Sequence, residues 1–257
     1  MRMEIVFQGF PGRSIHGALS WSSVVYVESG DKRILVDTGG PAKRSTLKKR
    51  LEQLNIDINR INTLFLSHFH DDHVRNYDFF PKAEILLSAA EDAWAATNPV
   101  EEIAFPEVYY DAVKKSGRVT LIHKEEEIAP GVQIMFLPGH TPGSMGLLLT
   151  SGDMPMTALP ADAVKNIAEL ATGEVGMTYA PEISRRSIAR IRDTAEIVIP
   201  GHDRVLKVER GRIVAMTEAR DGITMPAGVI DSDKNTILDL YIPKTDLPIR
   251  RWTDSAV

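Results

Sequence analysis

Three histidines and two aspartates occupy one short segment, His-Phe-His-Asp-Asp-His at residues 68–73. The segment directly follows the apolar run at residues 61–66, so it begins where a β-strand is expected to end. Because side chains alternate along a strand, His68 and His70 point to the same side and can share one metal ion. Once the chain turns, Asp72 and His73 can point to a second ion. Histidines and acids this dense rarely serve core packing, so the segment predicts a metal site.

Two further histidines, His140 and His202, each follow an apolar run and a Pro-Gly pair. Glycine permits a sharp turn and a close backbone approach, so we expect both histidines to leave strand ends as His68 does. Asp162 also follows an apolar stretch, where its carboxylate is placed to bridge two ions. The remaining histidines, His16 and His123, lack such a context and are expected to be structural.

This set of donors favours particular metals. Imidazole nitrogens and carboxylate oxygens suit zinc, with iron and manganese as alternatives, better than magnesium or calcium. Two such divalent ions lower the pKa of a bound water and stabilise an oxyanion, so no protein nucleophile is required. The predicted ligands are His68, His70, Asp72, His73, His140, Asp162 and His202.

Composition excludes several classes of protein. The chain of 257 residues fits a single domain, residues 1–257, in which we expect residues 226–257 to form a C-terminal extension. It has no cysteine, which excludes disulfides and thiolate ligands and fits a cytoplasmic location. The net charge of −5 counts against a nucleic-acid partner. No apolar run is long enough to span a membrane, and we expect no signal peptide.

The apolar patterning predicts many short strands and few helices. Strands are expected at residues 3–8, 22–28, 32–37, 61–66, 83–87, 119–123, 132–137, 145–150, 196–200, 204–208 and 211–215. Helices are expected at residues 43–54, from Ser88 to about Thr97, and from Ser184 to about residue 193. Hairpins alternating with single helices favour two packed sheets with helices outside, not one doubly wound parallel sheet.

Two local patterns add detail to this prediction. Ser88 and Glu91 have the spacing of a capping box at the start of a helix. Residues 98–118 are expected to be irregular, and part of them to form a lid. Trp94, Tyr109 and Tyr110 line either a substrate pocket or the core, and we favour the core.

The motifs together closely resemble the metallo-β-lactamase superfamily over about residues 20–205. The resemblance rests on Leu-Val-Asp-Thr-Gly at 35–39, the motif at 68–73, His-Thr-Pro-Gly-Ser at 140–144, Asp162, and Gly-His at 201–202. It implies an α/β (α+β) fold, the four-layer αββα sandwich.

The resemblance also implies a role for each residue of the site. One metal is expected at His68, His70 and His140, and the other at Asp72, His73 and His202. Asp162 matches a bridging carboxylate, and Asp37 matches an acid that orients the ligands through hydrogen bonds. The implied reaction is hydrolysis with a metal-bridging hydroxide as the nucleophile, in which Asp72 moves the proton.

Within this superfamily the length and spacing resemble the N-acyl homoserine lactonases. Those enzymes often carry a tyrosine three residues after the bridging aspartate, whereas this chain has Lys165. Lys165 is either a catalytic residue that polarises a carbonyl or pairs with an anionic group, or a solvated lysine at a helix start. The departure puts acyl-homoserine lactone itself in doubt as the substrate.

We therefore expect an enzyme that hydrolyses a small-molecule lactone or ester. One alternative is an oxidoreductase with a single iron, resembling persulfide dioxygenases. Another is a phosphodiesterase or nuclease of the same fold, because the run at 22–41 resembles small animal proteins of this superfamily with a nuclease role. A homodimer is expected only from the family resemblance.

Overall fold

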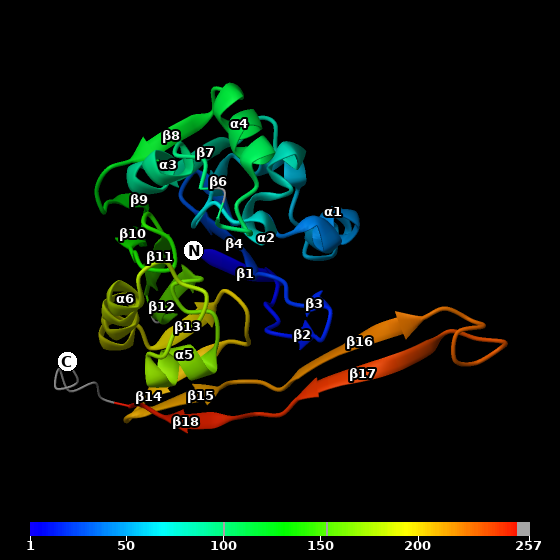
Figure 1. Ribbon diagram of the computed structural model, residues 1–257. Helices are drawn as coiled ribbons and strands as arrows, with labels where there is room; N and C mark the ends of the chain where they lie inside the picture. The colour runs from blue at the N-terminus through cyan, green and yellow to red at the C-terminus, as the bar shows by residue number, and fades with distance from the viewer. Residues whose placement is uncertain (100, 153, 251–257) are drawn as a thin grey trace.

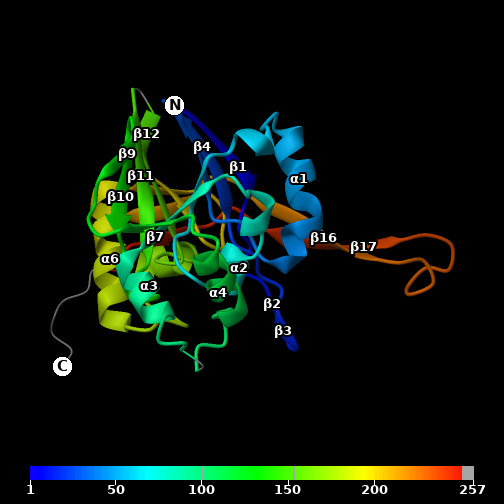
Figure 2. The same cartoon turned by 90° about the horizontal axis from the view of Figure 1, so that it is seen from above.

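The computed structural model describes residues 1–99, 101–152 and 154–250. Two large β-sheets pack face to face and helices cover both outer faces, so the fold is the predicted four-layer αββα sandwich (Figures 1 and 2). No helix in the described ranges is both long and apolar enough to cross a membrane.

The first sheet has six strands and a parallel centre. In spatial order these are β1 (Arg2–Phe7), β4 (Val24–Ser29), β5 (Lys32–Val36), β6 (Thr63–Phe65), β7 (Glu84–Ser88) and β8 (Val119–Ile122). Val36 of β5 lies opposite Phe65 of β6, which lies opposite Leu86 of β7. Because these strands are parallel, the segments that follow them leave from one edge of the sheet.

The second sheet has eight strands. In spatial order these are β18 (Asp246–Pro248), β15 (Arg212–Ala215), β14 (Leu206–Glu209), β13 (Ile197–Pro200), β12 (Met154–Ala161), β11 (Met145–Ser151), β10 (Val132–Phe136) and β9 (Glu127–Ala129). Strands β12 and β13 are parallel, with Ala161 opposite Pro200. The loops after these two strands therefore also leave from one edge.

Three apolar clusters hold the layers together. Between the sheets, Ile34 and Phe65 of the first pack with Ile134 and Leu147 of the second. The outer face of the first sheet is covered by α1 (Arg44–Gln53), α3 (Ala89–Ala95) and α4 (Glu107–Lys115). The outer face of the second is covered by α5 (Ile167–Thr172) and α6 (Pro181–Thr194). Burial of apolar surface in these clusters is the main force that fixes the sandwich.

The remaining elements are short. They are the hairpin β2 (Arg13–Ser14) and β3 (Gly17–Ala18), the helix α2 (Asp71–Val74), and the 3₁₀ turns η1 (Pro41–Lys43), η2 (Ile58–Arg60) and η3 (Tyr77–Phe79). A separate two-stranded hairpin, β16 (Ala219–Met225) and β17 (Thr236–Ile242), projects away from the sandwich in both views (Figures 1 and 2).

The expectation of an irregular segment at residues 98–118 is wrong over α4. Val113 of this helix is fully buried, and Tyr109 and Tyr110 pack partly buried against the same cluster. Lys114 and Lys115 lie in its last turn, where positive charge stabilises a helix. Trp94 joins the same cluster, so these aromatic rings belong to the core.

Other boundaries also differ from the prediction. Helix α6 begins at Pro181 and not at Ser184, because the fixed φ angle of proline suits the first helical position. The Ser184 hydroxyl instead lies 2.6 Å from that of Thr178. Strand β12 was not predicted, since Pro155 and Pro160 interrupt its pattern. The chain after β15 forms the projecting hairpin from Ala219 and then returns to the sandwich as β18.

Candidate metal centre

All seven predicted metal ligands come together where loops leave the two sheets. The structure groups them as His68 with His70 and His140; His68 with His73 and Asp162; and Asp72 with His73 and His202. Within each group the candidate ligand atoms lie within 4.8 Å of one another. The segment after β6 supplies four of the seven, and the loops after β10, β12 and β13 supply one each.

The inner atoms of this cluster lack hydrogen-bond partners in the described part of the chain. Nε2 of His68, His70 and His73 and Oδ1 of Asp162 are all buried without one. A buried polar atom without a partner costs folding free energy unless something else satisfies it. Five imidazoles and two carboxylates are the donors that zinc, iron or manganese take, so the cluster fits a metal site.

Asp162 occupies the middle of the cluster. Its Oδ1 lies 3.3 Å from His73 Nε2 and 3.2 Å from His202 Nε2, and its Oδ2 lies 3.4 Å from His140 Nε2. One carboxylate therefore faces histidines from both halves of the site. A carboxylate in this position can bridge two ions, which is the role that the resemblance implies for Asp162.

Asp37 orients the ligands of the segment after β6. Its Oδ2 accepts a hydrogen bond from His73 Nδ1 at 2.7 Å and from the Ser67 hydroxyl at 2.8 Å. The same hydroxyl lies 2.9 Å from His68 Nδ1. Because these partners occupy both Nδ1 atoms, the Nε2 atoms of His68 and His73 are free for a metal. Asp37 itself has a left-handed backbone (φ 57°), a strained conformation that clusters at functional sites.

The two Pro-Gly-His turns depend on their glycines. A Cβ on Gly201 would lie 2.1 Å from Asp162 Oδ1, and Gly139 has φ 130°, which other residues rarely adopt. In the first turn, His140 Nδ1 donates to the Met177 carbonyl at 3.0 Å, which leaves Nε2 facing the cluster. The prediction that glycine permits a close approach here is confirmed.

The buried charges of the site perturb one another. Burial, together with the nearby imidazoles of His73 and His70, lowers the pKa of His68 well below its ordinary value. Burial also lowers the pKa of His73, but Asp72, Asp162 and Asp37 outweigh it and raise that pKa well above the ordinary value. Without a metal, the His73 imidazole, which lies beside three carboxylates, therefore binds a proton more readily than the His68 imidazole.

Lys165 lies beside the site and is not a solvated lysine. Its side chain is only 15% exposed, and its ammonium pairs with Glu169 at 3.1 Å. Its backbone N–H donates to the same carboxylate at 2.8 Å. Burial lowers the pKa of His140 and the charge of Lys165 lowers it further, so the ammonium acts on the metal site electrostatically.

Glu91 is a part of the site that sequence reasoning assigned only to helix capping. Ser88 does cap α3 by accepting from the Glu91 N–H at 3.0 Å, but the Glu91 carboxylate turns away from it. Glu91 instead accepts hydrogen bonds from the Phe69 N–H at 2.8 Å, the Thr141 hydroxyl at 2.6 Å and the Gly143 N–H at 3.1 Å. A fully buried carboxylate thus joins the loop of His68 and His70 to the loop of His140.

Glu91 gives a testable pH dependence. Burial raises its pKa from 4.5 to about 7, although its three hydrogen bonds oppose the rise. Because the pKa is raised in the folded state, the stability it contributes is complete below pH 4.5 and is lost as the pH rises through about 7. Relative to the wild type, Glu91→Gln should gain up to about 3 kcal/mol of unfolding free energy between these limits.

Urea unfolding of both proteins, each stripped of metal and followed across this pH range, measures the difference. Glu52→Gln, which changes an exposed carboxyl, is the matched control. A difference between Glu91→Gln and wild type that does not change with pH would contradict the prediction.

Comparison with known proteins agrees with this geometry. The family model of the metallo-β-lactamase superfamily matches residues 20–202. Metallo-beta-lactamase domain-containing protein 1 of Xenopus laevis is 26% identical over 192 residues, covering 75% of each chain. N-acyl homoserine lactonase AiiB of Rhizobium rhizogenes is 29% identical over 180 residues, covering 63% of this chain and 64% of the lactonase. The match thus spans just under two thirds of that lactonase.

Solved structures share the fold. AidC, described as a dizinc quorum-quenching lactonase, superposes with a TM-score of 0.61 over 84% of this chain and 78% of its own, at 18% identity. At that identity the likeness establishes the architecture alone. The family match covers most of the chain and includes every residue of the candidate centre, so this protein belongs to the metallo-β-lactamase superfamily.

Proposed function

We propose that this protein hydrolyses a small-molecule lactone or ester at a pair of zinc ions held by the seven clustered residues. The observation that carries the proposal is the set of buried inner atoms without hydrogen bonds, on His68, His70, His73 and Asp162. Two zinc ions at such a site supply an activated water and an electrophile for a carbonyl group. Similar proteins, among them N-acyl homoserine lactonases of Rhizobium rhizogenes and Bacillus cereus, support the substrate class.

Asp72 is the residue that we assign to proton transfer. Its side chain is 33% exposed, whereas that of Asp162 is 6% exposed. Asp72 Oδ2 also lies 3.3 Å from His202 Nε2, so the carboxylate contacts both the site and solvent. A base in this position can take a proton from the attacking water and deliver it to the leaving group.

Apolar side chains exposed beside the centre fit a substrate with an apolar part. Met177 and Tyr179 are both exposed, and their backbones bind His140 through the Met177 carbonyl and the Tyr179 N–H. Ile103 is exposed in the turn that accepts a hydrogen bond from the Asp71 N–H. Exposed apolar groups next to a polar site are typical of small-molecule binding.

The test measures metal content and turnover on the same preparation. Protein purified without added metal should contain about two zinc ions per chain and hydrolyse members of a panel of γ-lactones and aryl esters. A chelator should abolish turnover, and added zinc should restore it. Fully metallated protein that is inert on the whole panel would refute the proposal. A single iron with oxygen uptake on glutathione persulfide would favour the dioxygenase alternative, and cleavage of phosphodiesters alone would favour a nuclease.

Lys165 is expected to bind the substrate and not to be a metal ligand. Lys165→Met should lower kcat/KM about tenfold, because one charged hydrogen bond to the substrate is lost, while zinc content stays unchanged. The double variant Lys165→Met/Glu169→Gln removes the carboxylate left without its partner and should show the same loss. Lys124→Met, on an exposed lysine, is the control. Full activity of the double variant would assign Lys165 a structural role only.

A further inference from the structure

The hairpin formed by β16 and β17, from Ala219 to Ile242 and here called the arm, has one apolar face. Ile223 lies opposite Leu238 in the antiparallel pair, and residues two apart on each strand share a side. The face is made of Ala219, Ile223, Met225, Leu238, Leu240 and Ile242, interrupted by Asp221 and Thr236. The opposite face is mixed and carries Arg220, Gly222, Thr224, Ile237, Asp239 and Tyr241.

Part of this apolar face is uncovered. In the described part of the chain neither β16 nor β17 pairs with a strand of the sandwich, and Ile223 and Leu238 are exposed. An isolated two-stranded hairpin is only marginally stable in water, and an apolar face requires a partner. No described residue of this chain covers the outer part of the face, which makes another molecule the candidate cover.

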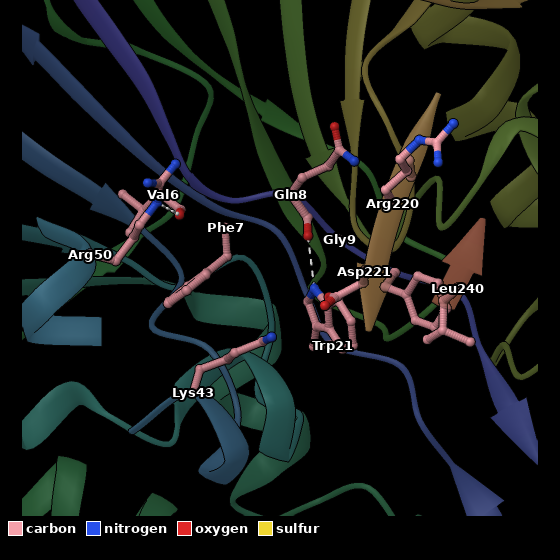
Figure 3. A pocket seen from close by; sticks show the side chains of 12 residues that line it. Val6, Phe7, Gln8, Gly9, Trp21, Lys43, Arg50, Arg220, Asp221 and Leu240 are labelled. Carbon is pink, nitrogen blue, oxygen red and sulfur yellow. Dashed lines mark hydrogen bonds between the residues drawn. The ribbon is translucent and has the colours of Figure 1, made fainter. Parts of the chain in front are cut away.

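A cavity of about 220 Å³ lies where the arm leaves the body (Figure 3). Asp221 and Leu240 of the arm form one wall, and Phe7, Trp21 and Lys43 of the body form another. We call this cavity the root pocket. Aromatic rings line it, and its charged groups are predominantly basic, because Arg50 and Arg220 also line it.

Lys43 is a cation of the root pocket that has no ion-pair partner among the described residues. Its ammonium lies 3.6 Å from the centroid of the Trp21 ring and 5.3 Å from that of Phe7 (Figure 3). Among the described residues no carboxylate lies within ion-pair distance of it. Burial lowers the pKa of Lys43, and Asp221 only partly opposes this. An additional carboxylate would therefore be stabilised here.

The tip of the arm has the complementary chemistry. Val229 and Ile230 are 58% and 56% exposed, and Asp231 and Asp233 follow them. Asp231 is engaged locally, since it accepts a hydrogen bond from the Asp233 N–H and lies 4.0 Å from Lys234. The Asp233 carboxylate has no ion-pair partner among the described residues. The tip thus presents two exposed apolar side chains and a carboxylate without an ion-pair partner among the described residues.

We propose that two copies of this chain dimerise by laying their arms antiparallel, apolar face on apolar face, with each tip in the root pocket of the other copy. A strand of seven residues spans roughly 24 Å, so the acidic tip and the basic root are separated along one arm. Antiparallel pairing about a two-fold axis brings each tip to the other root. Each apolar face is then covered by the same face of the other copy.

The first experiment measures the mass of the full chain by sedimentation velocity across a concentration series. The wild type should be a dimer, and Leu238→Asp, at an exposed position of the apolar face, should raise the dissociation constant at least about tenfold. Ile15→Asp makes the same change on the β2–β3 hairpin, where the side chain is also exposed, and should leave the dimer intact. A monomeric wild type, or a Leu238→Asp dimer as tight as the wild type, would overturn the proposal.

The second experiment tests where the tip binds. Lys43→Glu and Asp233→Lys should each weaken the dimer by placing like charges together, and the double variant should recover most of the loss. Lys49→Glu, an equal charge change on an exposed position of α1, should not. A double variant that dimerises no better than the weaker single variant would exclude this placement of the tip.

The third experiment uses the absence of cysteine from the chain. Ile223 lies towards the middle of the arm, where a two-fold axis brings each residue close to its own copy. Ile223→Cys should therefore form a disulfide-linked dimer on mild oxidation, and Ile15→Cys should not. Equal crosslinking of the two variants would argue against the arm pairing. None of these readouts depends on the proposed hydrolysis.

Discussion

Replacing Asp162 with alanine is expected to reduce the metal content to at most one ion per chain and to lower kcat/KM about 10³-fold or more. The carboxylate lies 3.2–3.4 Å from ligand nitrogens of His73, His202 and His140, so its loss separates the two halves of the site. It also removes the anion that would lie between two positive ions, so their mutual repulsion is no longer offset. Elemental analysis and kinetics on the best substrate of the panel measure the two effects.

The metal content per chain can be measured whether or not a substrate is known. If the Asp162→Ala protein retains two ions per chain, the carboxylate does not bridge them, whatever the activity. Asp31→Ala, which removes an exposed acid, provides the comparison for any general effect of lost charge.

Changing Asp37 to asparagine should weaken metal binding by about 10–100-fold while the protein remains folded. Asparagine tolerates the left-handed backbone of this position, so the strain at φ 57° is not a confounding cause, as it would be with alanine. The carboxylate accepts through both oxygens, from His73 Nδ1 and the Ser67 hydroxyl on Oδ2 and from the Ser67 N–H on Oδ1 at 2.8 Å. An amide has one acceptor oxygen and no charge, so it cannot accept all three hydrogen bonds. The imidazole of His73 then loses the orientation and basicity that a metal ligand needs.

Competition with a chromophoric chelator measures this affinity, and circular dichroism shows whether the fold is intact. Asp57→Asn makes the same change at an exposed acid that caps η2. An affinity within twofold of wild type would mean that metal binding does not depend on the charge of Asp37 and that this residue serves the backbone turn.

The candidate ligands could be found from the sequence because their signals are local. The four ligands of residues 68–73 lie in one short segment directly after a strand, and the two Pro-Gly-His turns repeat one pattern. Strand periodicity then predicts which side chains share a face. For Asp37 and Asp162 the residues alone were weaker evidence, and the family resemblance supplied the roles.

The support of those ligands could not be found in this way. Glu91 is 22 residues from Phe69 and 50 from Thr141, and its spacing from Ser88 predicted only a helix cap. The carbonyl that orients His140 belongs to Met177, 37 residues away. Hydrogen bonds of this kind depend on which loops the fold brings together, and no periodicity encodes them.

By itself, the sequence determined the order of most strands, the sandwich class and the set of residues that can bind metal. Apolar periodicity and short motifs carry that information, because each is set by neighbours along the chain. The tertiary structure decided that residues 107–115 form a helix, since Val113 and Tyr110 become apolar contacts only once a core exists to receive them. It also decided that the chain from Ala219 to Ile242 stands apart as an arm, because pairing with the sandwich depends on contacts between segments distant in sequence.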